Sequence, residues 1–323
     1  MTDCTERHLA VAVPDLAGYD EADLLAAAAA GIRAPSLHNS QPWLFGLRDG
    51  SIEVRADPAR RLLADRTGWA VRVACGAAAF NAGLALALRG RPAQLWLRPE
   101  ATVLARLSPL PPRPATRSET GLAASIPHRH SNREPFWPDP VPADARADLV
   151  AAAQAEGAWL DLLIGTTALR GVAEIARSAD RVLRRDPGYS LEVATWAEAD
   201  AAADGVPVRA GGPVGDLLPV RPYGGRSGRM VEPEPLVAVL GVAGDSAADQ
   251  VRAGAALQRV LLTAYGRGLA ASMISQPIEV PAAREQVRRA LGRSGSPQMM
   301  LRIGYGVRGN PTQRRPIAEV LLP

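Results

Sequence analysis

Four polar loops carry the residues of this chain that could do chemistry on a small molecule. The first, PSLHNSQPW at residues 35–43, places a hydroxyl, an imidazole and two amides on a short stretch between prolines. Such groups can bind the edge of a flat heterocycle, but serine and asparagine also satisfy the free carbonyls at the end of a helix. Ser36, His38 and Asn39 are therefore candidate ligand-binding residues, and helix capping is the alternative.

The second loop, PHRHSNREPF at residues 127–136, holds arginines on either side of a serine. Arg129, Ser131 and Arg133 could clamp a phosphate, because a guanidinium forms paired hydrogen bonds with phosphate oxygens. A solvated basic loop explains the same residues equally well when this loop is considered alone. Two shorter loops, MISQPIE at residues 273–279 and QRRP at residues 313–316, indicate no function by themselves.

The motifs of most enzyme classes are absent from the sequence. It contains no GxGxxG after a strand, no phosphate loop, no HExxH and no GxSxG. The four histidines lack the spacing and partners of a zinc site. The only two cysteines, Cys4 and Cys75, exclude a disulfide framework and any cysteine-based metal cluster. We therefore expect no metal ion.

The composition is that of a folded protein in a reducing compartment. The 323 residues are 47% hydrophobic and 22% charged, which is enough apolar material for one large core or two ordinary ones. All 37 basic residues are arginines spread along the chain, and aromatic residues are only 4%, which argues against a nucleic-acid surface. With neither a secretion signal nor a membrane span in the sequence, we expect a cytoplasmic protein without nucleic-acid or membrane partners.

Hydrophobic patterns predict the elements that position these loops. Residues 19–33, with acids at the front, predict a helix that must end before Pro35. Residues 42–57 predict a hairpin that turns at Asp49-Gly50, and residues 69–90 predict a central buried helix. A further helix is expected at residues 143–155. The first loop thus lies between a helix and a strand, and the second precedes a helix.

The chain contains an internal repeat. CGAAAFNAGLALALRGR aligns with AGAALQRVLLTAYGRGL, so that Gly76 matches Gly254 at a separation of 178 positions. Both copies predict a long helix that ends in Arg-Gly and follows a short apolar strand. Chance similarity of two alanine-rich helices is the alternative, but the matched flanks favour a repeat. The sequence predicts two related α+β halves, residues 1–122 and 123–323, joined by a linker near residues 107–125.

Residues 205–235 fit neither half's regular pattern. Thirteen of these 31 residues are glycine or proline, and we expect neither helix nor strand there. A loop of this length inside a compact domain is typically functional, and its apolar residues Leu217, Leu218, Val220, Tyr223 and Met230 could cover a pocket. We expect a lid-like segment, with a disordered linker as the alternative.

In chain order, RAPSLHNSQPW, RHSNREPF, SQPIE, RIGYG and RRP resemble the nitroreductase superfamily of FMN proteins, and in detail its Acg branch. The resemblance extends over residues 21–322. In ordinary nitroreductases two subunits exchange elements, and each FMN lies at their interface. Here the APS motif occurs only in the first half and the other motifs only in the second. The resemblance therefore implies a monomeric pseudo-dimer of two fused halves, each with an antiparallel-type central sheet flanked by helices, and one FMN site.

The same resemblance assigns residues of both halves to the FMN. The polar residues of the first loop would face the flavin, the arginines would hold its phosphate, and residues 277–279 would lie against the isoalloxazine ring. The assigned residues are Ser36, His38, Asn39, Arg129, Ser131, Arg133, Gln276, Pro277, Ile278, Glu279, Arg314 and Arg315. The sequence departs from the common pattern at two positions, since His130 stands where a second arginine is frequent and Val280 stands where ordinary nitroreductases often have glycine. These differences argue against the usual access of nicotinamide and substrate to the flavin.

The activity implied by the resemblance is transfer of a hydride or electron pair through FMN to an oxidised organic acceptor, such as a nitro compound or a quinone. The flavin would supply the chemistry and the protein its binding and orientation, so no side-chain nucleophile is expected. Two alternatives remain. One is an FMN-sequestering protein whose lid excludes NAD(P)H, and the other is a biosynthetic FMN-dependent dehydrogenase.

Overall fold

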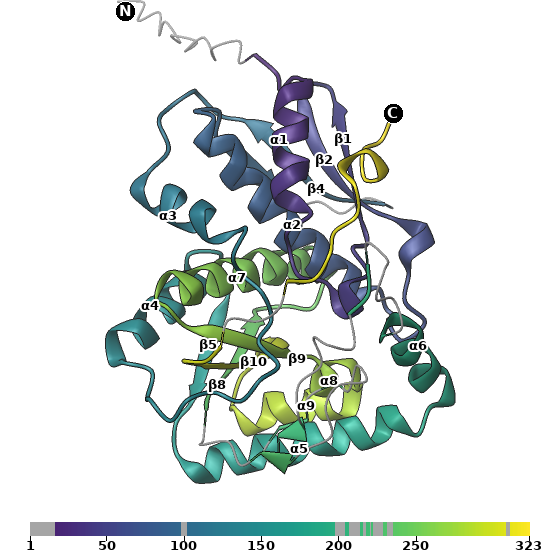
Figure 1. Cartoon of the computed structure of the whole chain (residues 1–323), viewed down its shortest axis with the longest axis vertical. Helices are drawn as coiled ribbons and strands as arrows, with labels where there is room; N and C mark the ends of the chain where they lie inside the picture. Colours follow the sequence, from purple (N-terminus) through teal and green to yellow (C-terminus); the bar gives the residue numbers. More distant parts are fainter. Residues whose placement is uncertain are drawn as a thin grey trace, which may run out of the picture.

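The computed structural model describes residues 17–97, 102–197, 204–206, 214–215, 218–219, 221, 229–230, 235–307 and 311–323. Within these residues, two four-stranded antiparallel sheets lie on either side of a central pair of long helices (Figure 1). This arrangement confirms the predicted α+β class.

The first sheet has the strand order β1-β2-β4-β3. Its strands are β1 Trp43–Arg48, β2 Ser51–Ala56, β3 Ala93–Trp96 and β4 Val103–Pro109. The predicted hairpin joins β1 to β2, with Asp49 and Gly50 at φ values of 49° and 68°, because a two-residue turn of this kind needs a positive φ at both positions. Helices α1 (Glu21–Gly31) and α2 (Trp69–Leu88) pack on this sheet around a shared core.

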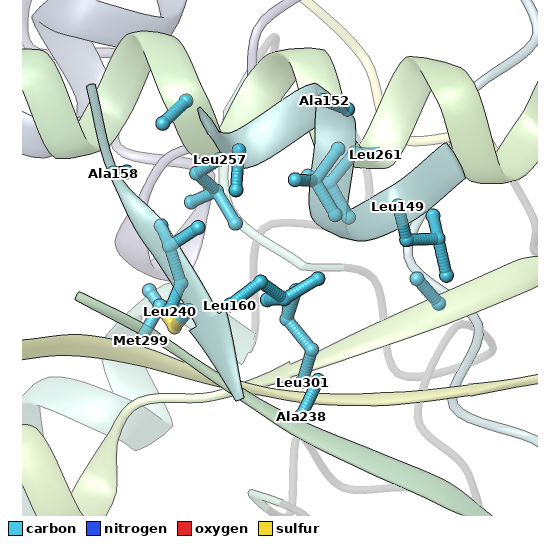
Figure 2. Packing of buried hydrophobic residues seen from close by; sticks show 14 of the residues in the cluster. Leu149, Ala152, Ala158, Leu160, Ala238, Leu240, Leu257, Leu261, Met299 and Leu301 are labelled. Atoms are coloured by element: carbon cyan, nitrogen blue, oxygen red, sulfur yellow. The ribbon is translucent and has the colours of Figure 1, made fainter. Parts of the chain in front are cut away.

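The second sheet, of order β5-β8-β10-β9, is covered on both faces. Its strands are β5 Trp159–Leu163, β8 Leu236–Val242, β9 Ala270–Ile274 and β10 Ser296–Gly304. One face packs on α4 (Ala143–Gln154) and α7 (Ala247–Gly266), where Leu149, Leu257 and Leu261 contact Leu160, Leu240 and Leu301 (Figure 2). The alternate residues of β8 face α5 (Thr166–Arg184) and α9 (Pro281–Ala290), so β8 is apolar throughout.

Where α2 and α7 cross, their backbones approach each other more closely than Cβ atoms at the crossing would allow. A Cβ atom on Gly76 would lie 2.0 Å from the carbonyl oxygen of Val251, and one on Gly254 would lie 2.0 Å from that of Val73. Gly76 and Gly254 are 178 positions apart in the sequence, and so are Val73 and Val251. The crossing therefore has an approximate two-fold symmetry in these contacts, in agreement with the predicted internal repeat.

Two segments cross from the side of one sheet to the edge of the other. After α3 (Arg117–Ser125), the chain reaches the edge of β9, where Asn132 N donates to Ala271 O at 2.8 Å. In the opposite direction, the C-terminal segment, drawn in yellow, returns to β1, and Phe45 N donates to Val320 O at 2.7 Å (Figure 1). The expected boundary between residues 122 and 123 lies inside α3.

The expected linker at residues 107–125 is wrong over most of its length. β4 continues to Pro109 and α3 begins at Arg117, so only the residues between them are irregular. The helix starts within this proline-rich stretch because Thr116 and Glu119 form a reciprocal capping box. The prolines of this stretch favoured a linker, and the capping box was not predicted.

Only parts of residues 205–235 belong to the described structure. The expectation of no strand there needs correction, since β6 (Val214–Gly215) pairs in parallel with β7 (Arg229–Met230) and thereby satisfies backbone groups. Leu218 is buried against the second sheet. Leu217, Val220 and Tyr223, which suggested a covering role, lie outside the described residues.

By length and composition, α2 could cross a membrane, but it is a core helix of this fold. Its apolar window is 78% buried inside the protein, between α1, α7 and the first sheet. The remaining helices of the described chain are α6 (Pro187–Ala197), which follows α5, and the one-turn helix α8 (Gln276–Glu279), which precedes α9.

Replacing Gly76 with alanine tests the close crossing. We expect Gly76→Ala to lower the free energy of unfolding by about 2 kcal/mol, because the added methyl group forces the two helix backbones apart. Thermal and urea denaturation measure the change. The matched control is Gly83→Ala in the same helix, where the Cβ would lie 3.7 Å from a Leu107 methyl group and stability should be unchanged or raised. Equal effects of the two substitutions would contradict the close approach.

Candidate functional site

A cavity of about 1100 Å³, including the space at its open mouth, lies between the elements that pack around the first sheet and those that pack around the second. Five parts of the chain contribute most of its walls: the loop at residues 35–39, the start of α2, residues 129–133, the end of β9 with the residues that follow it, and the C-terminal segment. Arg221, Leu257 of α7 and Met299 of β10 complete the described lining. Three of the four polar loops singled out in the sequence thus meet one another, and the fourth, at residues 313–316, contributes Arg314.

The first loop is held in an uncommon backbone conformation. His38, Asn39 and Gln41 have φ values of 55°, 55° and 52°, which are costly for residues other than glycine. Side-chain hydrogen bonds hold the loop there: Ser36 Oγ accepts from Gln41 N at 3.0 Å, and Asn39 Nδ2 donates to the carbonyls of Gly205 and Gln313. Ser36 and Asn39 therefore fix the shape of the cavity wall.

Arginines, and not the loop's serine or asparagine, satisfy the carbonyls at the end of α1. Arg314 Nε donates to Ile32 O at 2.7 Å, and Arg129 Nη2 donates to Arg33 O at 3.2 Å. Arg314 Nη2 also reaches Ala34 O at 3.4 Å. The negative end of the helix dipole thus helps to hold two buried guanidinium groups at the cavity wall.

These arginines form a cluster of positive charge. Burial and repulsion from Arg129 and Arg33 lower the pKa of Arg314 to about 9, and burial and Arg133 lower that of Arg129 to about 10. Burial, with Arg129 and Arg314 as the next causes, lowers the pKa of His130 to about 4. Arg129 Nε is buried and has no hydrogen-bond partner among the described residues. A bound anion would relieve this repulsion and satisfy the guanidinium.

His38 adds a neutral imidazole to the wall. Burial, reinforced by Arg221 and Arg133, holds its pKa well below the usual 6.5. At neutral pH it can therefore exchange hydrogen bonds with a ligand without adding charge.

The rest of the cavity is mainly apolar and suits a flat ring system. Its apolar lining includes Leu37, Trp69, Val73, Leu257, Met273 and Met299. The indole of Trp69 is fixed by a buried hydrogen bond from its Nε1 to Gln298 Oε1 at 2.8 Å. Gln276 also lines the cavity and donates to Pro219 O at 3.3 Å.

Four of the predicted site residues do not line this cavity. Arg315 turns away and pairs with the buried carboxylate of Asp57 at 3.1 Å, which ties the C-terminal segment to the first sheet. Pro277, Ile278 and Glu279 belong to α8, where an open loop was expected. Proline begins this single turn, and the turn directs Ile278 into the core and Glu279 away from the cavity.

Sequence reasoning missed Arg221. This arginine lines the cavity, donates from Nε to the hydroxyl of Tyr189 at 2.9 Å, and forms a buried ion pair with Glu279 at 2.6 Å. It stands alone among prolines and glycines, so no spacing pattern marks it. Only its burial, which depends on the tertiary fold, identifies it. In the part of the chain that the structure describes, no three His, Cys, Asp or Glu side chains gather as a metal site would require.

The chain is similar to known proteins in sequence and in fold. No family model matches the chain. The chain is 30% identical over 308 residues to "Putative NAD(P)H nitroreductase Rv3131" of Mycobacterium tuberculosis, spanning 90% of this chain and 88% of that protein. It is 28% identical over 304 residues to "Putative NAD(P)H nitroreductase acg" of the same species, spanning 89% and 92%. Among solved structures, a nitroreductase with bound FMN from Desulfitobacterium hafniense aligns with a TM-score of 0.43 at 13% identity, spanning 62% of this chain and 96% of that chain.

Inorganic phosphate should raise the pKa of His130 from about 4 towards its ordinary value, because a bound anion offsets Arg129 and Arg314. Histidine proton resonances followed by NMR from pH 3 to 8 measure this pKa, with chloride at equal ionic strength as the control. Without phosphate, the unfolded chain takes up this proton near pH 6.5 and the folded chain only near pH 4. The free energy of unfolding should therefore fall as the pH drops through this window, and phosphate should reduce the fall. An identical pKa in both salts would contradict an anion site.

Proposed function

The chain belongs to the nitroreductase family, and on that premise we propose that it is an oxidoreductase that binds one FMN in the cavity between its halves. The observation that carries the proposal is the meeting of buried Arg129 and Arg314 with an apolar wall in a single cavity. FMN has the matching chemistry, since a dianionic phosphate and a flat apolar ring occur in one molecule. The relative whose solved structure holds FMN supports the choice of this cofactor.

The residues present fit this cofactor. Arg129, Arg133 and Arg314 would hold the phosphate, and the unpartnered Nε of Arg129 would gain an acceptor. Trp69 and Leu257 would pack on the ring and keep water from it. Bound FMN would supply hydride or electron-pair transfer, whereas the protein contributes orientation, charge and exclusion of solvent.

We propose that the two halves correspond to the two subunits of an ordinary nitroreductase and that the protein is active as a monomer. The symmetric contacts of Gly76 and Gly254 support a duplicated origin. The crossing segments supply the cavity from both sides, so a second chain is not needed to complete it. The electron acceptor is proposed to be an oxidised organic compound, and the names of the relatives favour NAD(P)H as the reductant.

FMN sequestration is the second candidate function. The start of the segment at residues 205–235 is fastened to the wall of the site. Gly205 accepts a hydrogen bond from Asn39, and the neighbouring Asp204 pairs with Arg60 at 2.6 Å. A cover formed by this segment would slow access to the cofactor. Anaerobic mixing with NADPH separates the two functions, since rapid bleaching of the flavin supports the reductase and persistent yellow colour supports sequestration.

The phosphate clamp is tested by comparing FMN with riboflavin, which lacks the phosphate. We expect Arg129→Met to weaken FMN binding about tenfold, because one charge-assisted interaction is lost, and to leave riboflavin binding unchanged. Fluorescence titration of the flavin-free protein measures both affinities. The matched control is Arg289→Met, which removes an exposed arginine of α9 outside the cavity. Equal losses for FMN and riboflavin would assign Arg129 a structural role and contradict the clamp.

A further inference from the structure

A second cavity adjoins the proposed cofactor cavity. It has a volume of about 1860 Å³, including its open mouth, among the loop that precedes α2, the junction of α5 and α6, and the helices α8 and α9. Leu37, Trp69 and Ala70 line both cavities. A ligand in the second cavity would therefore be separated from the first by a single layer of side chains.

A buried ion pair spans the wall between the two cavities. Arg221 lines the first cavity, Glu279 lines the second, and their charged atoms lie 2.6 Å apart. Their side chains are only 7% and 5% exposed. The one-turn helix α8 also borders both cavities, because Gln276 lines the first cavity and Ile278 lines the second.

Carboxylates outnumber arginines among the described residues that line the second cavity, whereas the described lining of the first contains arginines and no carboxylate. Among the described residues, its ionisable lining consists of Asp65, Asp186, Asp245, Glu279, Glu285, Arg66, Arg284 and Arg288. Arg284 and Arg288 are paired with Asp245 and Glu285 at 2.6 and 2.7 Å. The third arginine, Arg66, has a side chain that is 85% exposed and lies 4.0 Å from the carboxylate of Asp186. The five carboxylates outnumber the three arginines of this lining, and Arg221 and Arg289 reach Glu279 and Glu285 from outside it.

One carboxylate oxygen in this wall lacks a donor. Glu279 Oε1 accepts from Arg221, but Glu279 Oε2 is buried and has no hydrogen-bond partner among the described residues. Asp65 is buried beside the same cavity, and burial, with Glu279 adding to the effect, raises the pKa of its carboxyl group. A buried carboxylate oxygen without a donor is costly, and a ligand that brings an N–H group or a positive charge would remove that cost.

We propose that the second cavity binds an organic cation: a flat, largely apolar molecule that carries amino groups. Trp69, Tyr189 and Ile278 would contact its body, and Glu279 Oε2 would accept from its N–H group. That this cation is the electron acceptor rests on the proposed function. An aromatic cation that gains two electrons and a proton becomes neutral; bound FMN would supply the electrons across the shared wall of Leu37, Trp69 and Ala70, and solvent would supply the proton. The neutral product would lose its attraction to the carboxylates and leave.

Two tricyclic dyes of similar shape and opposite charge test the cavity. Thionine is a cation with amino groups, and resorufin is an anion. We expect the oxidised protein, as purified, to bind thionine about tenfold more tightly than resorufin at low ionic strength, and salt to reduce the difference. Equilibrium dialysis with the red absorbance of the dyes gives both affinities. Resorufin binding as tight as that of thionine would overturn the proposal.

Substitutions assign the binding to this cavity. Glu279→Gln should weaken thionine binding about tenfold, through loss of a charge-assisted hydrogen bond. Leu63→Arg, at a mouth residue that is 76% exposed, should weaken it about threefold through repulsion and does not disturb the core. The matched control is Leu191→Arg, which places the same charge at a leucine that is 68% exposed and outside the cavity. If Glu279→Gln fails to fold, Leu63→Arg decides, and an unchanged thionine affinity in that variant overturns the proposal.

The flavin content of the same samples separates this proposal from the proposed function. Protein that retains FMN but does not bind thionine overturns the cation site alone. Protein that binds thionine in a manner sensitive to Leu63→Arg, but binds no FMN, supports the cation site and contradicts the proposed function.

Discussion

The close crossing of α2 and α7 is the contact on which the rest of the structure depends. Gly76 and Gly254 each leave room for a carbonyl oxygen of the opposite helix where a Cβ would otherwise lie. The same two helices carry Trp69, Val73 and Leu257 into the cavity wall. A wider crossing would separate these side chains. The packing of two backbones thus determines the width of a site whose residues come from distant parts of the chain.

The two cavities that Trp69 lines differ in the charged residues of their walls. Arg129 and Arg314 make one cavity positive, and they remain there because the carbonyls at the end of α1 accept their hydrogen bonds. The other cavity has an excess of carboxylates among its described residues, and the buried Arg221–Glu279 pair joins the two. Because Arg129, Arg221 and Glu279 are buried, water screens their charges only weakly. Such an arrangement favours an anionic cofactor on one side and a cationic partner on the other.

Much of the fold could be predicted from the sequence, because local rules decide it. Asp49-Gly50 sets the hairpin, Pro35 ends the first helix, and the match of Gly76 with Gly254 indicates the repeat. The individual directions of site side chains could not be predicted. Arg314 lines the cavity whereas its neighbour Arg315 points to Asp57, since adjacent side chains of an irregular segment leave the backbone in different directions. A single helical turn similarly separates Gln276 from Glu279, and Arg221 is recognisable only once its burial is known.

We propose that one chain builds one complete flavin site from its two halves. Native mass spectrometry of the flavin-loaded protein tests it most directly, because the method counts chains and cofactors in the same ion. We expect an ion that contains one 323-residue chain and one FMN, and we expect this species to persist when the protein is diluted. Two FMN molecules per chain, or FMN found only in ions that contain two chains, would contradict it.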